Sequence, residues 1–392
     1  MKNKLSKRVI ALAAATVLAL GTLTACGSTP ASTNTKESTG SAQSTETVKS
    51  SETAKSSEAA QSSEEVKVLD PVEITNVSYD PTRELYEAYN ELFAGYWKDK
   101  TGQDVTVVQS HGGSGKQALE VANGLEADVV TLALEGDIDT IVDAGLIEAG
   151  YTSEFDLDSS PYTSTIVFLV RKGNPKNIQD WDDLLEDGVG VITPNPKTSG
   201  GARWNYLAAW YYFETQGQSE DEILASMKKL YENVLVLDSG ARGSTTTFTE
   251  NGQGDVLLAW ENEAFLSLEE APGEYEIIVP SVSILCQPTV AIVDEVVDNR
   301  ETREVATEYL QYLYSDEAQN LEAQNYYRPS NETILAEYET ADESNVITEI
   351  PADGKWIITN VDLVNIEHFG GWKEAGATHF VDGGLFDSIY EK

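Results

Sequence analysis

Short apolar runs alternate with segments of helical period along the chain from residue 72 onward. The runs are rich in β-branched and other apolar residues and are four to eight residues long, which is typical of buried strands. They occupy residues 72–77, 105–109, 127–134, 164–170, 189–192, 234–237, 255–260 and 289–293. Helical patterns lie between most of them. This alternation predicts an α/β fold built on parallel strands.

The clearest helix signal begins at Asp80-Pro81. Asp is a favoured N-cap residue, and Pro is a favoured first residue of a helix. Apolar side chains then recur at helical spacing, at Leu85, Tyr86, Tyr89, Leu92, Phe93, Tyr96 and Trp97. Further helical patterns cover residues 117–124, 204–214 and 219–231.

The amino-terminal segment has the pattern of a secretory signal. Four basic residues precede an apolar run over residues 9–20, which is too short to span a bilayer comfortably, and Leu23-Thr24-Ala25-Cys26 follows. A cysteine after such small residues resembles the lipobox of bacterial lipoproteins. Residues 1–25 are therefore predicted to be a lipoprotein signal peptide, and Cys26 the lipidated first residue of the mature chain. The alternative is an ordinary signal peptide with an incidental cysteine.

Residues 26–70 are predicted to be a disordered tether rich in Ser, Thr and Glu. Residues 27–66 include no aromatic residue, Leu or Ile, and six-residue units ending in Ser-Ser-Glu recur at 47–52, 53–58 and 59–64. Such a segment cannot bury enough apolar area to offset its chain entropy. With a lipid on Cys26, it predicts a protein anchored on the extracellular face of the cell membrane, as in Gram-positive cells.

Charge and cysteine content exclude some classes of protein. The formal net charge is −40 at pH 7 and is spread along the chain, so nucleic acid is not an expected partner. The other cysteine, Cys286, lies in an apolar stretch, and no intramolecular disulfide is expected once Cys26 is acylated. We interpret Cys286 as a packed residue.

Three turns rich in glycine and serine stand directly before helical patterns, at residues 110–116, 198–204 and 238–245. Glycine lets a ligand approach the backbone closely, and the first turn of a helix carries unpaired N–H groups and a partial positive charge. In open α/β sheets, ligands gather at the carboxyl ends of strands, where these turns fall. The turns therefore predict an anion site formed by backbone N–H groups.

Long stretches around these turns resemble the sulfate-binding proteins of bacterial ABC transporters, a family that also includes thiosulfate binders. The matching stretches are residues 76–86, 109–117, 161–175, 193–210, 238–245 and 259–264, and the resemblance covers most of residues 72–371. It implies a two-lobed, periplasmic-binding-protein-like fold (type II), monomeric, with the ligand cleft between the lobes. Lobe 1 is expected to hold residues 72–160 plus 285–392, and lobe 2 residues 161–284. The implied partners are a membrane permease and its ATPase complex, without cofactor or metal.

The resemblance also implies the groups that hold the ligand. They are the N–H of Asp80, the N–H and hydroxyl of Ser114, the N–H groups of Gly200, Gly201 and Ala241, and the indole N–H of Trp260. Helix-start amides and an indole only donate hydrogen bonds, which suits a fully ionised anion such as sulfate. Phosphate keeps a proton part of the time, and that proton would face another donor. Thiosulfate, or another tetrahedral oxyanion such as molybdate, stays open as the main ligand.

Two other functions fit the residues less well. The turn at residues 112–116 differs from a P-loop, which has Gly where Ser110 stands and Ser or Thr where Gln117 stands. A secreted hydrolase with Ser114 as nucleophile beside His111 would lack a Gly-x-Ser-x-Gly elbow and an evident triad. No enzyme is therefore expected.

The remaining polar and aromatic candidates have simpler interpretations. The histidines His111, His368 and His379 are expected to be surface or packing residues without a metal cluster. Lys116, Arg203 and Arg242 are expected to pair with carboxylates rather than with the ligand. Every tryptophan except Trp260 is interpreted as a core or interface residue.

Overall fold

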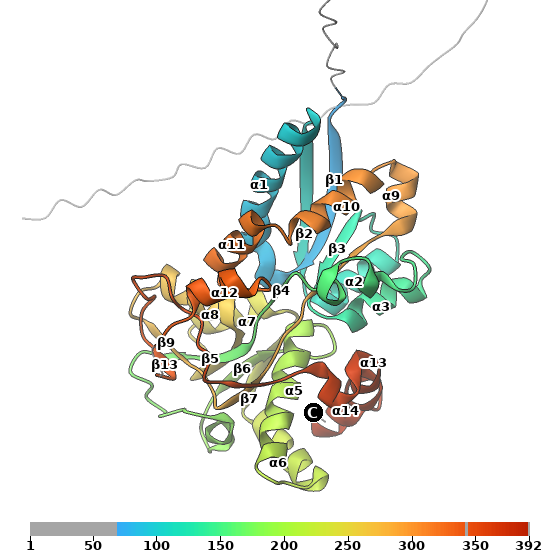
Figure 1. Ribbon diagram of the computed structural model, residues 1–392. Coiled ribbons are helices and arrows are strands. Elements are labelled where there is room, and N and C mark those ends of the chain that lie inside the picture. Colours follow the sequence, from blue (N-terminus) through green and yellow to red (C-terminus); the bar gives the residue numbers. More distant parts are fainter. Residues whose placement is uncertain (1–68, 342–343, 391–392) are drawn as a thin grey trace, which may run out of the picture. The chain divides into compact units, whose positions relative to one another are not determined.

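The computed structural model describes residues 69–341 and 344–390, so the predicted signal peptide, Cys26 and nearly all of the predicted tether lie outside the described residues. Two main sheets organise the described part (Figure 1). The first has the strand order β11 (Thr289–Ile292), β3 (Val129–Leu132), β1 (Val72–Tyr79) and β2 (Val105–Gly112). The second has the order β13 (Val346–Ile347), β9 (Tyr275–Ile278), β5 (Ile166–Arg171), β8 (Val256–Trp260), β6 (Val191–Pro194) and β7 (Val234–Asp238). We call the elements around the first sheet lobe 1 and those around the second lobe 2.

Helices connect and cover these strands. The α-helices are α1 (Arg83–Thr101), α2 (Ser114–Ala122), α3 (Glu135–Asp143), α4 (Asp156–Ser159), α5 (Gly200–Thr215), α6 (Glu220–Glu232), α7 (Ala241–Thr249), α8 (Glu261–Glu270), α9 (Asp294–Arg300), α10 (Arg303–Tyr312), α11 (Asp316–Gln324), α12 (Glu332–Tyr338), α13 (Gly371–Ala375) and α14 (Leu385–Ile389). Shorter turns are η1 (Asp80–Thr82), η2 (Tyr151–Ser153), η3 (Trp181–Leu185), η4 (Ile366–Phe369) and the π-helical turn η5 (Gly376–Phe380). Within the described ranges, none of the helices combines the length and apolar character needed to cross a bilayer.

The sheets are mixed rather than parallel. β1 pairs in parallel with β2 and β3, and β6 pairs in parallel with β7 and β8, whereas β5 runs antiparallel to β8 and β9, and β11 antiparallel to β3. The predicted α/β class is confirmed, and parallel strands occur in both sheets, but the sequence pattern did not predict the antiparallel strands that accompany them. Ile166 at the start of β5 pairs with Trp260 at the end of β8. The chain therefore enters lobe 2 at the end of the sheet where the parallel strands β6, β7 and β8 finish, and β5 runs in the opposite direction.

The connections between the sheets lie side by side. The chain passes from lobe 1 to lobe 2 between α4 and β5, and returns between β10 (Val282–Ile284) and β11. The two connections bond to each other, since the N–H of Ser164 donates to the carbonyl of Cys286 at 3.0 Å and the reverse bond measures 2.9 Å. β4 (Tyr162–Thr163), in the first connection, pairs with β12 (Arg328–Pro329), which precedes the C-terminal return to lobe 2. β10 pairs with β14 (Asp362–Val364).

In lobe 1, the apolar face predicted for the first helix packs against α10. The predicted start at Asp80 is observed as η1, which leads directly into α1. Tyr89 and Phe93 of α1 are fully buried, and each ring centroid lies 5.0 Å from that of Tyr309 on α10. These contacts join the N-terminal helix of lobe 1 to helices that follow the return from lobe 2.

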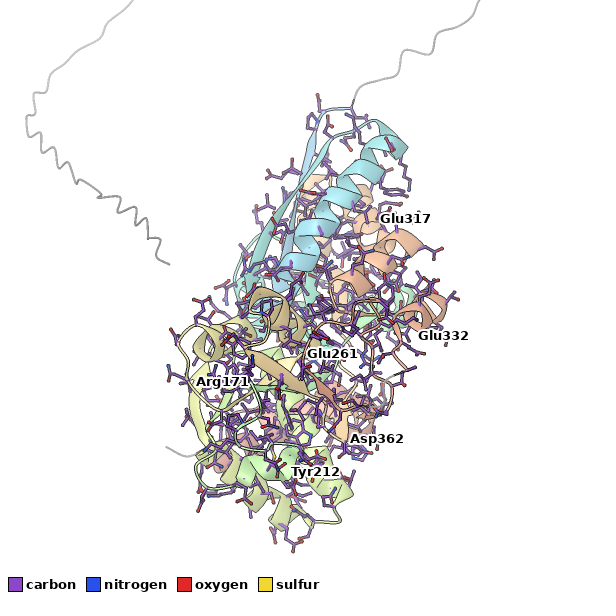
Figure 2. All side chains as sticks on the ribbon, turned by 90° about the vertical axis from the view of Figure 1, so that its left-hand side faces the viewer. Arg171, Tyr212, Glu261, Glu317, Glu332 and Asp362 are labelled. Atoms are coloured by element: carbon purple, nitrogen blue, oxygen red, sulfur yellow. The ribbon has the colours of Figure 1, made fainter. Side chains whose placement is uncertain are left out.

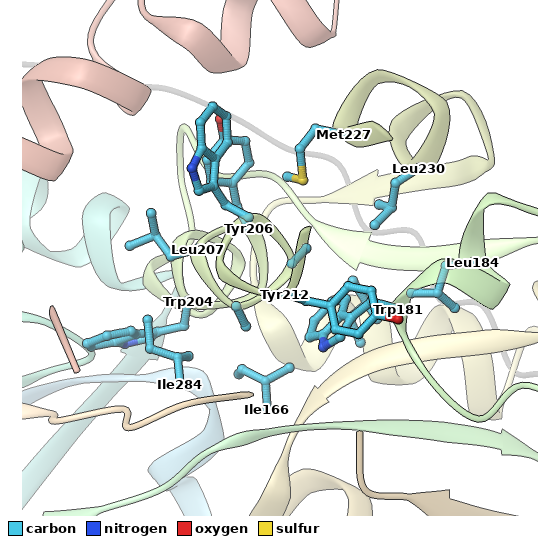
Figure 3. Packing of buried hydrophobic residues seen from close by; sticks show 14 of the residues in the cluster. Ile166, Trp181, Leu184, Trp204, Tyr206, Leu207, Tyr212, Met227, Leu230 and Ile284 are labelled. Atoms are coloured by element: carbon cyan, nitrogen blue, oxygen red, sulfur yellow. The ribbon is translucent and has the colours of Figure 1, made fainter. Parts of the chain in front are cut away.

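In lobe 2, the core forms around α5. Trp204 and Leu207 of this helix belong to one buried cluster with Ile166 and Ile284, and Figure 3 shows these side chains gathered beside the helix. The tryptophans interpreted as core residues are at most 7 % exposed, which confirms that interpretation. Cys286 is fully buried, as expected.

The C-terminal segment packs largely on lobe 2. β13 extends the second sheet by pairing with β9, and α14 packs against α6. Trp372, Phe380 and Phe386 join the buried cluster that contains residues of α5. Figure 1 shows α13 and α14 beside α5. Lobe 1 was expected to hold all of residues 285–392, whereas these C-terminal elements pack largely against lobe 2. The segment pairs with the outer edge of β9 and packs on aromatic residues of α5 and α6.

Candidate functional site

Segments from both lobes meet at one small pocket. It is lined by Tyr79, Asp80, Pro81, Gly112, Gly113, Ser114, Ser199, Gly201, Ala241 and Trp260. The free space between these residues is about 160 Å³, in gaps too narrow for a water molecule. Entry of a ligand therefore requires the walls of the pocket to move apart first.

Several helices begin at this pocket. Asp80, Ser114 and Ala241 are the first residues of η1, α2 and α7, and Gly201 is the second residue of α5. Backbone N–H groups at these positions have no acceptor within their own helix, and each helix start carries a partial positive charge. Their convergence produces a local field that favours an anion, despite the acidic surface of the chain.

The structure brings five of the six predicted ligand residues to this pocket: Asp80, Ser114, Gly201, Ala241 and Trp260. The sixth, Gly200, does not contribute to the lining. A Cβ atom added to Gly200 would lie 2.7 Å from the Cβ of Ala133 and 3.0 Å from the Cδ2 of Leu134, so that side of Gly200 packs on lobe 1.

Sequence reasoning missed Ser199, which lines the pocket as the N-cap of α5. Its hydroxyl oxygen accepts a hydrogen bond from the N–H of Ala202 at 3.3 Å, which leaves the hydroxyl proton free to donate elsewhere. The preference for serine at N-cap positions, directly before Gly200-Gly201, was the available signal.

The indole of Trp260 is held in a confined position. Its Nε1 atom is buried and has no hydrogen-bond partner among the described residues, and the side chain is only 1 % exposed. A Cβ atom added to Gly201 would lie 2.3 Å from this nitrogen, so only glycine leaves room for the indole. A buried N–H group without an acceptor is costly, which indicates a ligand as its partner.

Ser114 is oriented in a similar way to Ser199. Its hydroxyl oxygen accepts a hydrogen bond from the N–H of Ala133 at 3.0 Å. The hydroxyl proton of Ser114 is thereby left to donate toward the pocket, so two serine hydroxyls add to the backbone donors.

Nearby cations pair with carboxylates and do not line the pocket. Arg203 contacts Asp137 at 2.8 Å, and Lys116 contacts Glu120 at 3.4 Å. Arg242 contacts Glu84 of lobe 1 at 2.6 Å and the buried Glu263 at 3.0 Å. The interpretation of these three cations as partners of carboxylates is confirmed.

Asp80 is the one carboxylate side chain in the lining, counted over the described residues. Burial raises the pKa of its carboxyl group, while Arg83 and Arg242 oppose that shift. Its Oδ2 atom lies against the start of α7, because a Cβ atom on Gly240 would be only 2.3 Å away. The positive end of α7 is a favourable place for a carboxylate.

The three histidines contact groups other than the Ser114 hydroxyl in the described part of the chain. The hydroxyl of Ser114 is bonded to the backbone of Ala133, and no described hydrogen bond joins it to His111. Burial lowers the pKa of His111 to about 4, and the positive charges of Arg83 and Arg242 contribute. His368 contacts Glu214 at 2.9 Å, and His379 lies 3.2 Å from the hydroxyl of Tyr206. In the described part of the chain, no group of His, Cys, Asp or Glu has the arrangement of a metal site.

Known proteins resemble this chain over most of its length. Residues 82–328 match the family model for bacterial extracellular solute-binding proteins. The chain is 54% identical to the sulfate-binding protein of Escherichia coli (strain K12) over 327 residues, which cover 82% of this chain and 94% of that protein. It is 45% identical to a thiosulfate-binding protein of Pseudomonas aeruginosa over 320 residues, 81% of this chain and 92% of that protein.

A solved structure supports the architecture. The sulfate-binding protein SubI from Mycobacterium tuberculosis H37Rv matches with a TM-score of 0.67 and 30% identity, over 78% of this chain and 98% of that one. The similarities agree with the two sheets and with the pocket at their junction. The chain belongs to the family of bacterial extracellular solute-binding proteins.

Proposed function

We propose that this chain binds sulfate in the pocket between its lobes and delivers it to the permease and ATPase complex of an ABC importer. The observation that carries the proposal is the indole N–H of Trp260. It is buried, has no acceptor among the described residues, and lies in a pocket that no Lys or Arg side chain lines.

The proposed ligand groups are uncharged N–H and O–H donors. They are the N–H groups of Asp80, Ser114, Gly201 and Ala241, the hydroxyls of Ser114 and Ser199, and the indole of Trp260. Hydrogen bonds to a charged group contribute about 1.5 to 3 kcal/mol each, whereas micromolar affinity requires only about 8 kcal/mol in total. The donors are therefore sufficient without contact from Arg203 or Arg242, whose charges are paired with carboxylates.

Sulfate is preferred over other oxyanions for two reasons. A site made only of hydrogen-bond donors suits a fully ionised dianion. It disfavours phosphate, because the remaining proton of phosphate would face another donor. The relative named as a sulfate-binding protein is also more similar to this chain than the one named as a thiosulfate-binding protein. Thiosulfate remains the second candidate, because its charge and shape fit the same donors.

Titration calorimetry with sulfate, thiosulfate, molybdate and phosphate tests the ligand. We expect one sulfate per chain with a dissociation constant in the micromolar range or below, about −8 kcal/mol or stronger. Phosphate is expected to bind at least about 100-fold more weakly, a difference of about 2.7 kcal/mol. Tighter binding of thiosulfate would favour the second candidate, and no binding of any oxyanion would contradict the proposal.

The protein is further proposed to be a receptor without enzymatic activity, monomeric, and held on the outer face of the cell membrane by a diacylglyceryl group on Cys26. Purified protein should not hydrolyse sulfate or phosphate esters. The anchor follows from the lipobox-like sequence at residues 23–26, and two acyl chains hold a protein stably where one holds it only marginally.

A further inference from the structure

A buried ion pair lies directly beside Trp260. Arg328 donates from Nε to Oε2 of Glu261 at 2.7 Å and from Nη2 to Oε1 at 2.8 Å. Both side chains are buried, at 9 % and 2 % exposure. Glu261, labelled in Figure 2, is the residue that follows Trp260 and the first residue of α8.

Arg328 belongs to the connection between the lobes. It lies on β12 and pairs with Thr163 of β4, the strand by which the chain passes from lobe 1 to lobe 2. Its Nη2 atom also donates to the carbonyl of Ile358 at 3.1 Å. The backbone N–H of Glu261 donates to the carbonyl of Thr165 at 2.9 Å. Glu261 is therefore fixed by both its backbone and its side chain to the segments that join the lobes.

The neighbouring residue ties the same turn to lobe 1. Asn262 is fully buried, and its Nδ2 atom donates to the carbonyl of Pro81 at 3.0 Å. Pro81 and Trp260 both line the pocket. The start of α8 thus contacts the pocket, the lobe connection and the facing lobe through three consecutive residues.

We infer that Arg328 is a positioning residue for the indole of Trp260. By holding Glu261, Arg328 sets the orientation of the indole N–H relative to the other donors as the lobes approach each other. The inference rests on the proposed function, because the role of Trp260 as a ligand group comes from it. A buried ion pair contributes little net stability compared with an apolar pair of the same size. The experiment therefore tests the effect of Arg328 on the orientation of the Trp260 indole rather than on stability.

The variant Arg328→Lys keeps the positive charge but loses the two-pronged contact with Glu261. We expect it to weaken sulfate binding about tenfold, which corresponds to about 1.4 kcal/mol. The matched control is Arg300→Lys, because Arg300 pairs with the buried Asp128 in lobe 1, away from the pocket. This control should leave sulfate affinity unchanged.

A double-mutant cycle separates positioning from general structure. In a Trp260→Phe background, Arg328→Lys should weaken sulfate binding by less than about twofold, because the donor that it orients is already gone. An equal loss in both backgrounds would overturn the inference. If Arg328→Lys fails to fold, the same double-mutant cycle is measured with Glu261→Gln and Trp260→Phe.

A readout without ligand keeps the inference distinct from the proposed function. The indole ¹H–¹⁵N resonance of Trp260 can be assigned by its absence in Trp260→Phe. In the ligand-free protein it should shift in Arg328→Lys and stay in place in Arg300→Lys, and an unshifted resonance would overturn the inference. Failure of the unmodified protein to bind sulfate would instead contradict the proposed function, and this resonance would still decide the inference.

Discussion

Gly201 and Trp260 show how closely single residues determine the pocket. The glycine carries no side chain where a Cβ atom would lie 2.3 Å from the indole nitrogen. We therefore predict that Gly201→Ala lowers sulfate affinity about 10- to 100-fold, the loss of one hydrogen bond to a charged group. Gly95→Ala is the control, because a Cβ atom there meets nothing within 4 Å. Calorimetry on both variants checks the prediction, and equal affinities would contradict it.

His379 gives the fold a dependence on pH. Burial lowers its pKa to about 4, from an ordinary value of 6.5. As the pH falls, His379 therefore binds a proton in the unfolded chain before it does so in the folded chain. The free energy of unfolding decreases as the pH falls from about 6.5 to about 4. The contribution is at most about 3 kcal/mol, since each pKa unit corresponds to about 1.36 kcal/mol.

Urea unfolding of His379→Gln and the unmodified protein at several pH values measures this contribution. We predict that the stability of the unmodified protein relative to the variant decreases as the pH falls from 7 to 4. A constant difference across that range would show that His379 does not titrate as described.

At the scale of elements, the pocket is made by the beginnings of helices. The sequence showed three of these starts, because glycine and serine turns precede helical patterns at residues 110–116, 198–204 and 238–245. It could not show which groups of each turn face the ligand. Ser199 lines the pocket and Gly200 does not, because the packing of Gly200 on Ala133 involves residues far apart in the chain.

Ser199 combines two functions that a matched variant can separate. As the N-cap of α5 it contributes about 1 kcal/mol to stability, and we propose that its hydroxyl also donates to the ligand. We predict that Ser199→Ala lowers both stability and sulfate affinity, the latter about tenfold. Ser315→Ala is the control, because Ser315 caps α11 by accepting from the N–H of Ala318 at 3.2 Å. Thermal unfolding should shift similarly in both, and an affinity loss in the control would contradict the assignment.

At the scale of the whole molecule, the sequence predicted the α/β class and the positions of the main strands. It did not predict the antiparallel strands that accompany the parallel ones, and it expected the C-terminal residues in lobe 1, whereas they pack largely on lobe 2. Strand direction depends on the edge at which the chain enters a sheet, and the C-terminal segment follows the free edge of β9. Both are properties of the assembled lobes rather than of local sequence patterns.

The anchor and the receptor should act independently. Cys26→Ala is predicted to release the protein into the medium, because the lipid that holds it at the membrane is absent. The sulfate affinity of the purified variant should stay unchanged, since about forty residues, which we propose act as a tether, separate Cys26 from the lobes. Fractionation of cells and medium checks the release. A variant that stayed with the membrane, or bound sulfate more weakly once purified, would contradict this separation.

The central claim is that uncharged donors from both lobes hold sulfate without a cationic side chain. A crystal structure of the complex with sulfate measures this directly. The account predicts sulfate oxygens about 2.7 to 3.2 Å from the Trp260 indole, a serine hydroxyl and helix-start N–H groups, with no Lys or Arg nitrogen at that distance. Sulfate bound outside the pocket, or held by the guanidinium of Arg203 or Arg242, would contradict it.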